Sequence, residues 1–352
     1  MPARIHPRET ATVVVQHDTA SDFLALAGPT LARHEASSNI VLAHAVKRVD
    51  PATFQLCADA SPAFPDASSM QPRRTEGAFW LTLWSADAGT PALDLVLACV
   101  DGTLGQYPIF LWSPRRAHEQ SSAWLRPRLA ALADHLRACV PPERVFSVFG
   151  MTSLVAPFAR RWSQLTGFPV EPEPFYAAHF SFCTRRTLRR ASAPLPAGHL
   201  LRPATPRDRE QVAQLCKEFA DDSIHFPLSL ERARVEAHEL IARQQIWVYD
   251  ADGAVGTICA YTRNTARVSA ITKVYTTPRA RRRGCAELLV RRVTSHLLDG
   301  GKETVVLYVG HENSAQKVYH RVGFAGLCGD EKVDGVEDSL ELGFVGSTRG
   351  HW

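Results

Sequence analysis

The chain has 352 residues, of which 45% are hydrophobic, and it carries a formal net charge of +4. This length and composition predict a globular protein with two domains and sizeable cores. The net charge is too small to argue for nucleic acid. The sequence contains no run of about 20 apolar residues, which a membrane span would need. Its N-terminus lacks the basic-then-apolar pattern of a secretory signal, so we expect a cytoplasmic protein.

The eight cysteines are scattered along the chain, at positions 57, 99, 139, 183, 216, 259, 285 and 328. They form no C-x-x-C pair and no His/Cys cluster at the spacing of zinc ligands. We therefore expect reduced cysteines that serve mostly in packing, and no metal site.

Hydrophobic periodicity predicts the elements of the first half. Near the N-terminus, the pattern predicts a strand at 12–16, two helices between 20 and 45 that break near 28–29 or 37–39, and a loop at 61–77. The elements that follow are strands at 79–84, 92–100 and 109–112, and a helix at 123–139.

A unit at 144–168 is repeated later in the chain. The sequence VFSVFG, followed by a helix and Gly167-Phe168, matches VVLYVG, followed by a helix and Gly323-Phe324. An internal duplication explains this match. Nothing upstream of the first copy resembles the basic turn described below, so the first half is interpreted as a degenerate copy.

A proline-rich segment at 171–198 joins the two halves, and its interior, 175–183, could form a strand that crosses between them. The second half then opens with a strand at 200–204. It continues with helices from about 206 and at 229–243, a three-strand meander at 246–249, 255–261 and 268–275, and two final strands at 325–328 and 339–344 around an acidic loop at 330–338.

A basic turn at residues 279–286 lies between a β-branched run, 271–276, and a helix-period segment. Gly284 stands where that helix begins. The first N–H groups of a helix lack intrahelical partners, and the helix dipole adds partial positive charge, so a phosphate is stabilised there. The four arginines of this turn add formal charge. The pattern predicts a polyphosphate cofactor.

Two other interpretations concern the same turn. The arginine run could be a nuclear-localisation or nucleic-acid patch, but its place between a strand and a helix favours the cofactor, and no interleaved aromatic residues support nucleic acid. Cys285 could be an activated thiolate at a helix N-terminus, or a small packing residue, and we favour the packing residue.

The motif Arg281-x-x-Gly284-x-Ala286 follows a strand and precedes a second strand, a helix bearing Tyr319, and Gly323-Phe324. This order resembles the acetyl-CoA-binding core of the GNAT N-acyltransferase superfamily, in its two-lobed form with a degenerate first half. The resemblance implies an α/β fold, a tandem GNAT-like architecture with a central mixed β-sheet flanked by helices in each half. It also implies a degenerate GNAT-like domain at 1–190 and an acetyl-CoA-binding GNAT domain at 191–352.

The resemblance also implies site residues. In the family, the loop amides hold the CoA pyrophosphate, the preceding strand pairs with pantetheine, and a Tyr reprotonates the CoA thiolate. On this chain the Tyr is Tyr319, and the cofactor-binding residues are Val274, Tyr275, Thr276, Arg281, Arg282, Arg283, Gly284, Cys285, Ala286 and Asn313. Asn313 stands six residues before Tyr319, whereas the family has an Asn seven before, and with Gln316 it also fits a helix N-cap.

The function implied is transfer of an acetyl group from acetyl-CoA to the amine of a small molecule, by direct attack in a ternary complex. No nucleic-acid or membrane partner is expected. The alternatives are a protein or peptide acetyltransferase acting on lysine or N-terminal amines, hinted at by the acidic loop, and a non-catalytic CoA-binding regulatory module. No carboxylate stands on the strand at 270–276, so the general base stays open among Glu218, Asp221, Asp222, His225, His311 and Glu312.

Overall fold

The structure is a computed structural model that describes residues 12–59, 70–87, 90–190, 194–223, 225–329 and 332–351. In the first half, the strands are β1 (Thr12–His17), β2 (Phe79–Asp87), β3 (Thr90–Gly102), β4 (Gly105–Trp112), β5 (Ser147–Met151) and β6 (Tyr176–Thr184). The helices are α1 (Ala20–Arg33), α2 (Glu35–Val46), α3 (Pro51–Asp59), α4 (Ser122–Cys139) and α5 (Thr152–Thr166).

The second half repeats this mixture of strands and helices. Its strands are β7 (His199–Pro203), β8 (Ile246–Ala251), β9 (Ala254–Asn264), β10 (Val268–Thr276), β11 (Thr304–Gly310) and β12 (Glu337–Gly343). Its helices are α6 (Arg209–Asp221), α7 (Leu230–Ala242), α8 (Cys285–Asp299) and α9 (Ala315–Val322). Among the described residues, no helix is both long and apolar enough to cross a membrane.

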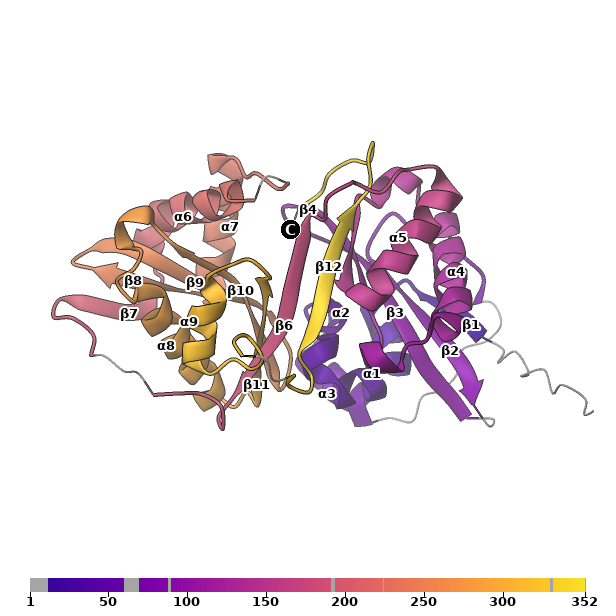
Figure 1. Cartoon of the computed structure of the whole chain (residues 1–352), viewed down its shortest axis with the longest axis horizontal. Helices are drawn as coiled ribbons and strands as arrows, with labels where there is room; N and C mark the ends of the chain where they lie inside the picture. The colour runs from indigo at the N-terminus through magenta and orange to yellow at the C-terminus, as the bar shows by residue number, and fades with distance from the viewer. Residues whose placement is uncertain are drawn as a thin grey trace, which may run out of the picture.

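The described strands form one mixed sheet of twelve, in the order β1-β2-β3-β4-β5-β12-β6-β11-β10-β9-β8-β7. Figure 1 shows two lobes side by side. The first lobe contains β1 to β5 with α1 to α5, and the second contains β7 to β11 with α6 to α9. Strands β12 and β6 lie between the lobes.

The two halves exchange their last strands. Strand β12, from the end of the second half, pairs antiparallel with β5 of the first lobe. Strand β6, from the end of the first half, pairs antiparallel with β11 of the second lobe. The exchanged strands also pair with each other, with Asp338 opposite His179. Each lobe therefore depends on a strand from the other half of the chain.

Helices cover both faces of this sheet. On one face, α4 and α5 pack on the first lobe, and α8 and α9 pack on the second. On the other face, α1, α2 and α3 cover the first lobe, and α6 and α7 cover the second. Because both faces are covered, the central strands carry buried side chains on both sides.

A buried carboxylate fastens the first lobe to the second at α2. Glu35 is only 4% exposed. Its Oε1 accepts hydrogen bonds from the Thr265 hydroxyl (2.6 Å) and the Arg267 backbone N–H (2.7 Å), and its Oε2 accepts one from Arg267 Nε (2.8 Å). A buried charge is tolerated when it is paired and hydrogen-bonded in this way.

The predicted fold class, a mixed sheet flanked by helices in each half, is confirmed, and so is the crossing strand near 175–183. The predicted helix break was wrong. The break lies at His34, between α1 and α2, whereas residues 28–29 and 37–39 are helical. The side chains of Ser38 and Asn39 donate to the carbonyls of Leu31 (3.0 Å) and Arg263 (3.2 Å).

The predicted final pair of strands was also wrong in part. Residues 325–328 form turns and bends, and only β12 is a strand. Residues 61–69 of the predicted loop at 61–77 lie outside the described residues, as do 330 and 331 of the acidic loop. The domain division at residue 190 stays a prediction.

Candidate active site

Two residues of the basic turn, just before α8, have a left-handed backbone. Gly284 has φ 78°, a left-handed backbone conformation that favours glycine, and Arg282 has φ 63°. Among the described residues, and apart from the two chain neighbours of Gly284, no heavy atom lies within 4 Å of where a Gly284 Cβ would stand. Within the described chain, we find no acceptor for the backbone N–H groups of residues 282–287. These unpaired donors and the open space beside them suit a phosphate group.

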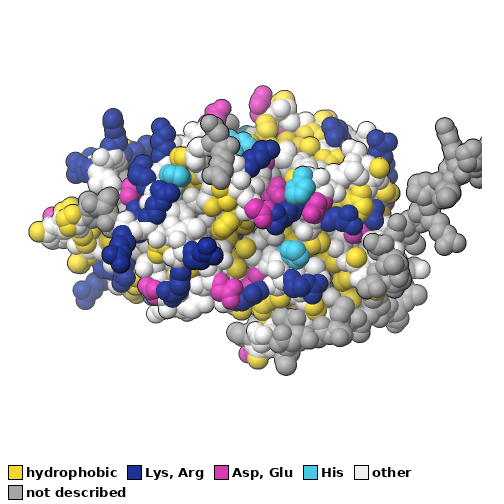
Figure 2. Space-filling view, turned by 60° about the horizontal axis from the view of Figure 1, so that its bottom comes forward, with side chains coloured by type: hydrophobic (Ala, Val, Ile, Leu, Met, Phe, Trp, Pro, Cys, Tyr) yellow, Lys and Arg dark blue, Asp and Glu magenta, His cyan; other side chains and the backbone are white. Residues whose placement is uncertain are grey.

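The arginines of the turn divide into two kinds. The Arg281 side chain ties the turn back to β10, since its Nε donates to the Thr276 carbonyl (3.0 Å) and its guanidinium lies 5.6 Å from the centre of the Tyr275 ring. Arg282 and Arg283 are exposed. Figure 2 shows Lys and Arg side chains gathered over its left part, which is the second lobe. This charge favours an anionic ligand.

Strand β10 leads from the sheet to the basic turn and diverges from β11 on the way. The parallel pairing of these two strands runs from Val268 opposite Thr304 to Ile271 opposite Leu307. Irregular register between β10 and β9 at Ala270–Lys273 bends β10 at the same point. Residues 272–276 consequently lie beside a gap in the ladder, where a backbone ligand could pair. The predicted residues Val274, Tyr275 and Thr276 all belong to this stretch.

An inter-lobe cleft of about 910 Å³ borders this stretch of β10. Its walls come from α2 and the β3–β4 loop of the first lobe, from α6 and α7 of the second, and from β6, β10 and β12. Lys273, Val274 and Tyr275 line it. The basic turn and the cleft are therefore joined by a single strand.

Glu341 is a buried carboxylate on the wall of the inter-lobe cleft. It lies on β12, opposite Tyr176 of β6, and is 0% exposed. Its Oε1 accepts a hydrogen bond from the Ser147 hydroxyl (2.6 Å), and its Oε2 has no partner among the described residues. Burial raises the pKa of Glu341 to about 8, against the smaller opposite effect of the Ser147 bond.

Two positively charged side chains on the wall of the inter-lobe cleft contact neighbouring side chains. Lys273 Nζ lies 2.7 and 2.6 Å from the two carboxylate oxygens of Glu236. Burial lowers the pKa of Lys273, but Cys216 and Glu236 outweigh this and the net pKa is raised. The Arg263 guanidinium lies 5.5 Å from the centre of the Tyr308 ring. The cleft therefore presents fixed charges together with aromatic surface, which suits a compact polar ligand.

Tyr319 lies on α9 and is 8% exposed. Its ring packs edge-on against Phe324, with 5.9 Å between centroids, in the core under β11. Burial, and then the neighbouring Cys259 and Tyr176, raise the pKa of the Tyr319 hydroxyl above its usual value. The hydroxyl therefore keeps its proton at neutral pH.

For Asn313 and Cys285, the sequence left two interpretations each. The Asn313 side chain accepts a hydrogen bond from the Ala315 backbone N–H (2.9 Å) at the start of α9 and also lines the inter-lobe cleft. Cys285 is 5% exposed and packs in the core beneath α8, which agrees with the packing interpretation. Ala286 follows it in the first turn of α8.

The six candidate bases are scattered. Asp222 and His225 line the inter-lobe cleft. Burial, and then the charge of Glu218, raise the pKa of Tyr275. Asp221 is hydrogen-bonded to Lys217, His311 is paired with Asp338 at 3.2 Å, and Glu312 is exposed. Sequence reasoning missed Glu341, whose burial depends on the strand exchange.

Comparison with known proteins identifies similar folds. Residues 211–324 match the family model described as the acetyltransferase (GNAT) family. A GCN5-related N-acetyltransferase from Sphaerobacter thermophilus has a TM-score of 0.50 at 14% identity, over 94% of each chain. A Drosophila protein solved by X-ray crystallography has a TM-score of 0.58 at 14% identity, over 94% of this chain and 99% of its own. No curated protein matches this chain.

A tandem GNAT protein from the clavulanic acid biosynthesis pathway covers 96% of this chain and 100% of its own, at 14% identity and a TM-score of 0.44. At identities this low, the two similarities at TM-scores of 0.50 and 0.58 show the fold alone.

Proposed function

We propose that this chain, which has two lobes and a segment at 211–324 that matches the acetyltransferase (GNAT) family model, transfers an acetyl group from acetyl-CoA to the amine of a small molecule in the inter-lobe cleft. The observation that carries the proposal is the course of β10. This strand has the basic turn at its end and lines the cleft with Lys273, Val274 and Tyr275. A cofactor held at the turn would thus reach an acceptor held in the cleft.

The residues around the basic turn fit CoA. The unpaired N–H groups of residues 282–286, with the open space at Gly284, would hold the pyrophosphate. The stretch Val274–Thr276, beside the gap between β10 and β11, would pair with the pantetheine amides. Arg281, Arg282 and Arg283 would add charge, and Asn313 would border the thioester end from the start of α9.

Enclosure between two lobes supports a small acceptor. Pockets of roughly 300–1,000 Å³ bury most of a drug-sized ligand, and the inter-lobe cleft has about 910 Å³. Its walls come from both halves of the chain, which favours a compact amine over an extended peptide.

When bound, acetyl-CoA supplies the thioester whose carbonyl carbon the neutral amine attacks. In our proposal, Glu341 in its ionised form accepts the proton that the amine nitrogen loses. A carboxyl with a pKa of about 8 is well matched to this task at mildly alkaline pH. Tyr319, on α9, would supply the proton that the CoA sulfur needs when it leaves.

Calorimetric titration of CoA into the full-length protein tests the cofactor site. We expect a micromolar dissociation constant, about −8 kcal/mol. Gly284→Glu should abolish the heat of binding, because it places a negative charge and a long side chain in the open space beside the turn. Gly284→Ala is the matched control, since it imposes the same left-handed backbone on a residue with a Cβ but adds no charge.

Unchanged CoA binding in a folded Gly284→Glu protein would refute the cofactor assignment. The acceptor class is tested separately, by incubating protein and acetyl-CoA with a panel of small amines and with lysine peptides and following acetylated products by mass spectrometry. Acetylation of peptides in preference to every small amine would overturn the small-molecule proposal.

A further inference from the structure

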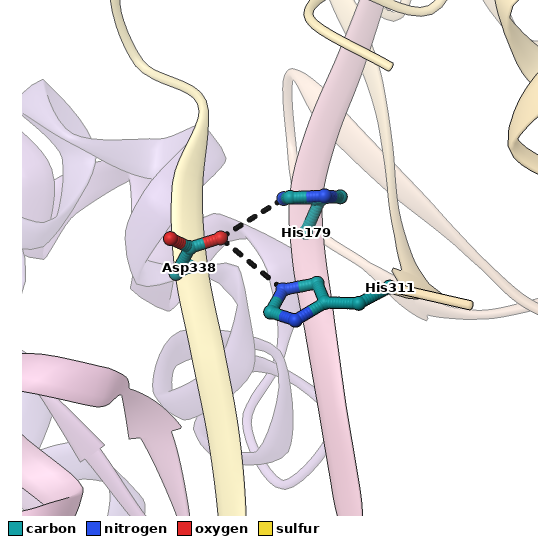
Figure 3. Close-up of side chains that lie close together, drawn as sticks. All are labelled: His179, His311 and Asp338. Carbon is teal, nitrogen blue, oxygen red and sulfur yellow. Dashed lines mark ion pairs between the residues drawn. The ribbon is translucent and has the colours of Figure 1, made fainter. Parts of the chain in front are cut away.

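Two histidines and an aspartate meet where the two halves of the chain exchange strands. His179 lies on β6, Asp338 lies opposite it on β12, and His311 directly follows β11. Figure 3 shows both imidazole rings turned toward one carboxylate oxygen. Asp338 Oδ1 is 2.9 Å from His179 Nδ1 and 3.2 Å from His311 Nε2. Three segments that are distant in the sequence thus contribute one side chain each.

The spacing of these atoms suits a metal ion. One nitrogen or oxygen from each residue lies within 4.8 Å of the other two. An ion bonded to imidazole nitrogen at about 2.0–2.1 Å and to carboxylate oxygen at about 2.0–2.2 Å holds tetrahedral ligand atoms about 3.3 Å apart. The three side chains therefore need only small movements to accept an ion.

The backbone holds the ligands in place. His179 is paired with Asp338 on one side and with Val309 on the other. The His311 backbone N–H donates to the Ala177 carbonyl (3.0 Å), and Gln316 Nε2 donates to the His311 carbonyl (2.5 Å). Ligands fixed by their own backbone lose little freedom when an ion binds.

The cluster is also open to solvent. The side chains of His179, His311 and Asp338 are 31%, 38% and 61% exposed. An ion could enter directly, and water could complete its coordination. The cluster lies on the α5/α9 face of the sheet, because His179 alternates with Tyr176 and Phe180, which pack on the opposite face. It is therefore separate from the Glu341 carboxylate.

We propose that His179, His311 and Asp338 bind a divalent transition-metal ion such as Zn²⁺, which ties β12, β6 and the end of β11 together. Two imidazoles and one carboxylate are a ligand set that Zn²⁺ accepts, with water at the open position. The ion fastens the exchanged strands. The proposal does not depend on the proposed function.

The test uses full-length protein without a histidine tag, treated with chelator and dialysed. Titration with ZnCl₂ by calorimetry should show one site per chain with a micromolar or tighter dissociation constant, and the melting temperature should rise with Zn²⁺ concentration.

Variants identify the ligands. His179→Gln and Asp338→Asn should each weaken Zn²⁺ binding by more than the roughly 10–100-fold that loss of an outer-shell partner costs. His118→Gln is the matched control, because His118 is a 73% exposed histidine whose ring lies 4.0 Å from Glu119. It should leave Zn²⁺ affinity unchanged.

Either of two results would overturn the site. The first is absence of saturable Zn²⁺ binding in the parent protein. The second is unchanged binding in Asp338→Asn or in the double variant His179→Gln, His311→Gln. Circular dichroism shows whether each variant is folded, and Asp338→Asn keeps the side-chain shape if the histidine variants do not fold.

Discussion

Replacing Glu341 by Gln should stabilise the protein at alkaline pH. Gln has the same shape and can still accept the Ser147 hydrogen bond, but it cannot ionise. Burial raises the pKa of Glu341 from 4.5 in the unfolded chain to about 8 in the fold. Each tenfold change in proton affinity is worth about 1.4 kcal/mol, so ionising this buried carboxyl costs the fold about 5 kcal/mol.

The direction in which the stability of the fold depends on pH follows from the raised pKa of Glu341. Because the folded pKa is raised, the contribution of the neutral carboxyl to stability is fully present below about pH 4.5 and is lost as the pH rises to about 8. Relative to the parent, Glu341→Gln should therefore gain little at pH 5, roughly 3 kcal/mol at pH 7 and about 5 kcal/mol at pH 8.5.

Urea unfolding followed by tryptophan fluorescence at these three pH values measures the effect, with Glu337→Gln, on the same strand, as the control. Parallel pH profiles for the parent and Glu341→Gln would refute the reasoning, since the carboxyl would then have an ordinary pKa. We also expect acetyl transfer to fall by about 10²- to 10⁴-fold, because Gln accepts no proton.

Three further predictions follow from the site and the strand exchange. Tyr319→Phe should lower kcat by about 10²- to 10⁴-fold with little change in CoA affinity; turnover within about threefold of the parent would leave Tyr319 as a core aromatic only. Equilibrium dialysis should give one CoA per chain, because only the second half has a basic turn, and two would show a second site. A fragment of residues 190–352 should fail to give the cooperative unfolding transition of the full chain, because β12 loses both of its pairing strands.

Local patterns predicted most of the individual elements. Helices α4 and α5 and the meander β8–β9–β10 fall close to the predicted ranges, because periodicity and breaker residues act over a few positions. The basic turn was readable for the same reason, since the strand, Gly284 and helix α8 are contiguous in the sequence.

The strand exchange was beyond sequence reasoning, because it depends on which distant strands pair. Glu341 alternates with Leu340 and Leu342, a pattern usual for a strand with one face in solvent. Strand β12 is central in the sheet, so both faces are covered and the carboxylate is buried. The cluster of His179, His311 and Asp338 depends on the same pairing, and no spacing in the sequence reveals it.

The exchange also sets the order in which a growing chain can fold during synthesis. Strand β5 leaves the ribosome long before its partner β12, since residues 152–336 are made between them. At roughly 5–20 residues per second, that interval is about 10 to 40 s. Throughout it, β5 has an open edge on the side that β12 will occupy, and an unpaired edge invites pairing with other chains. We expect newly made chains to depend on chaperones during this interval.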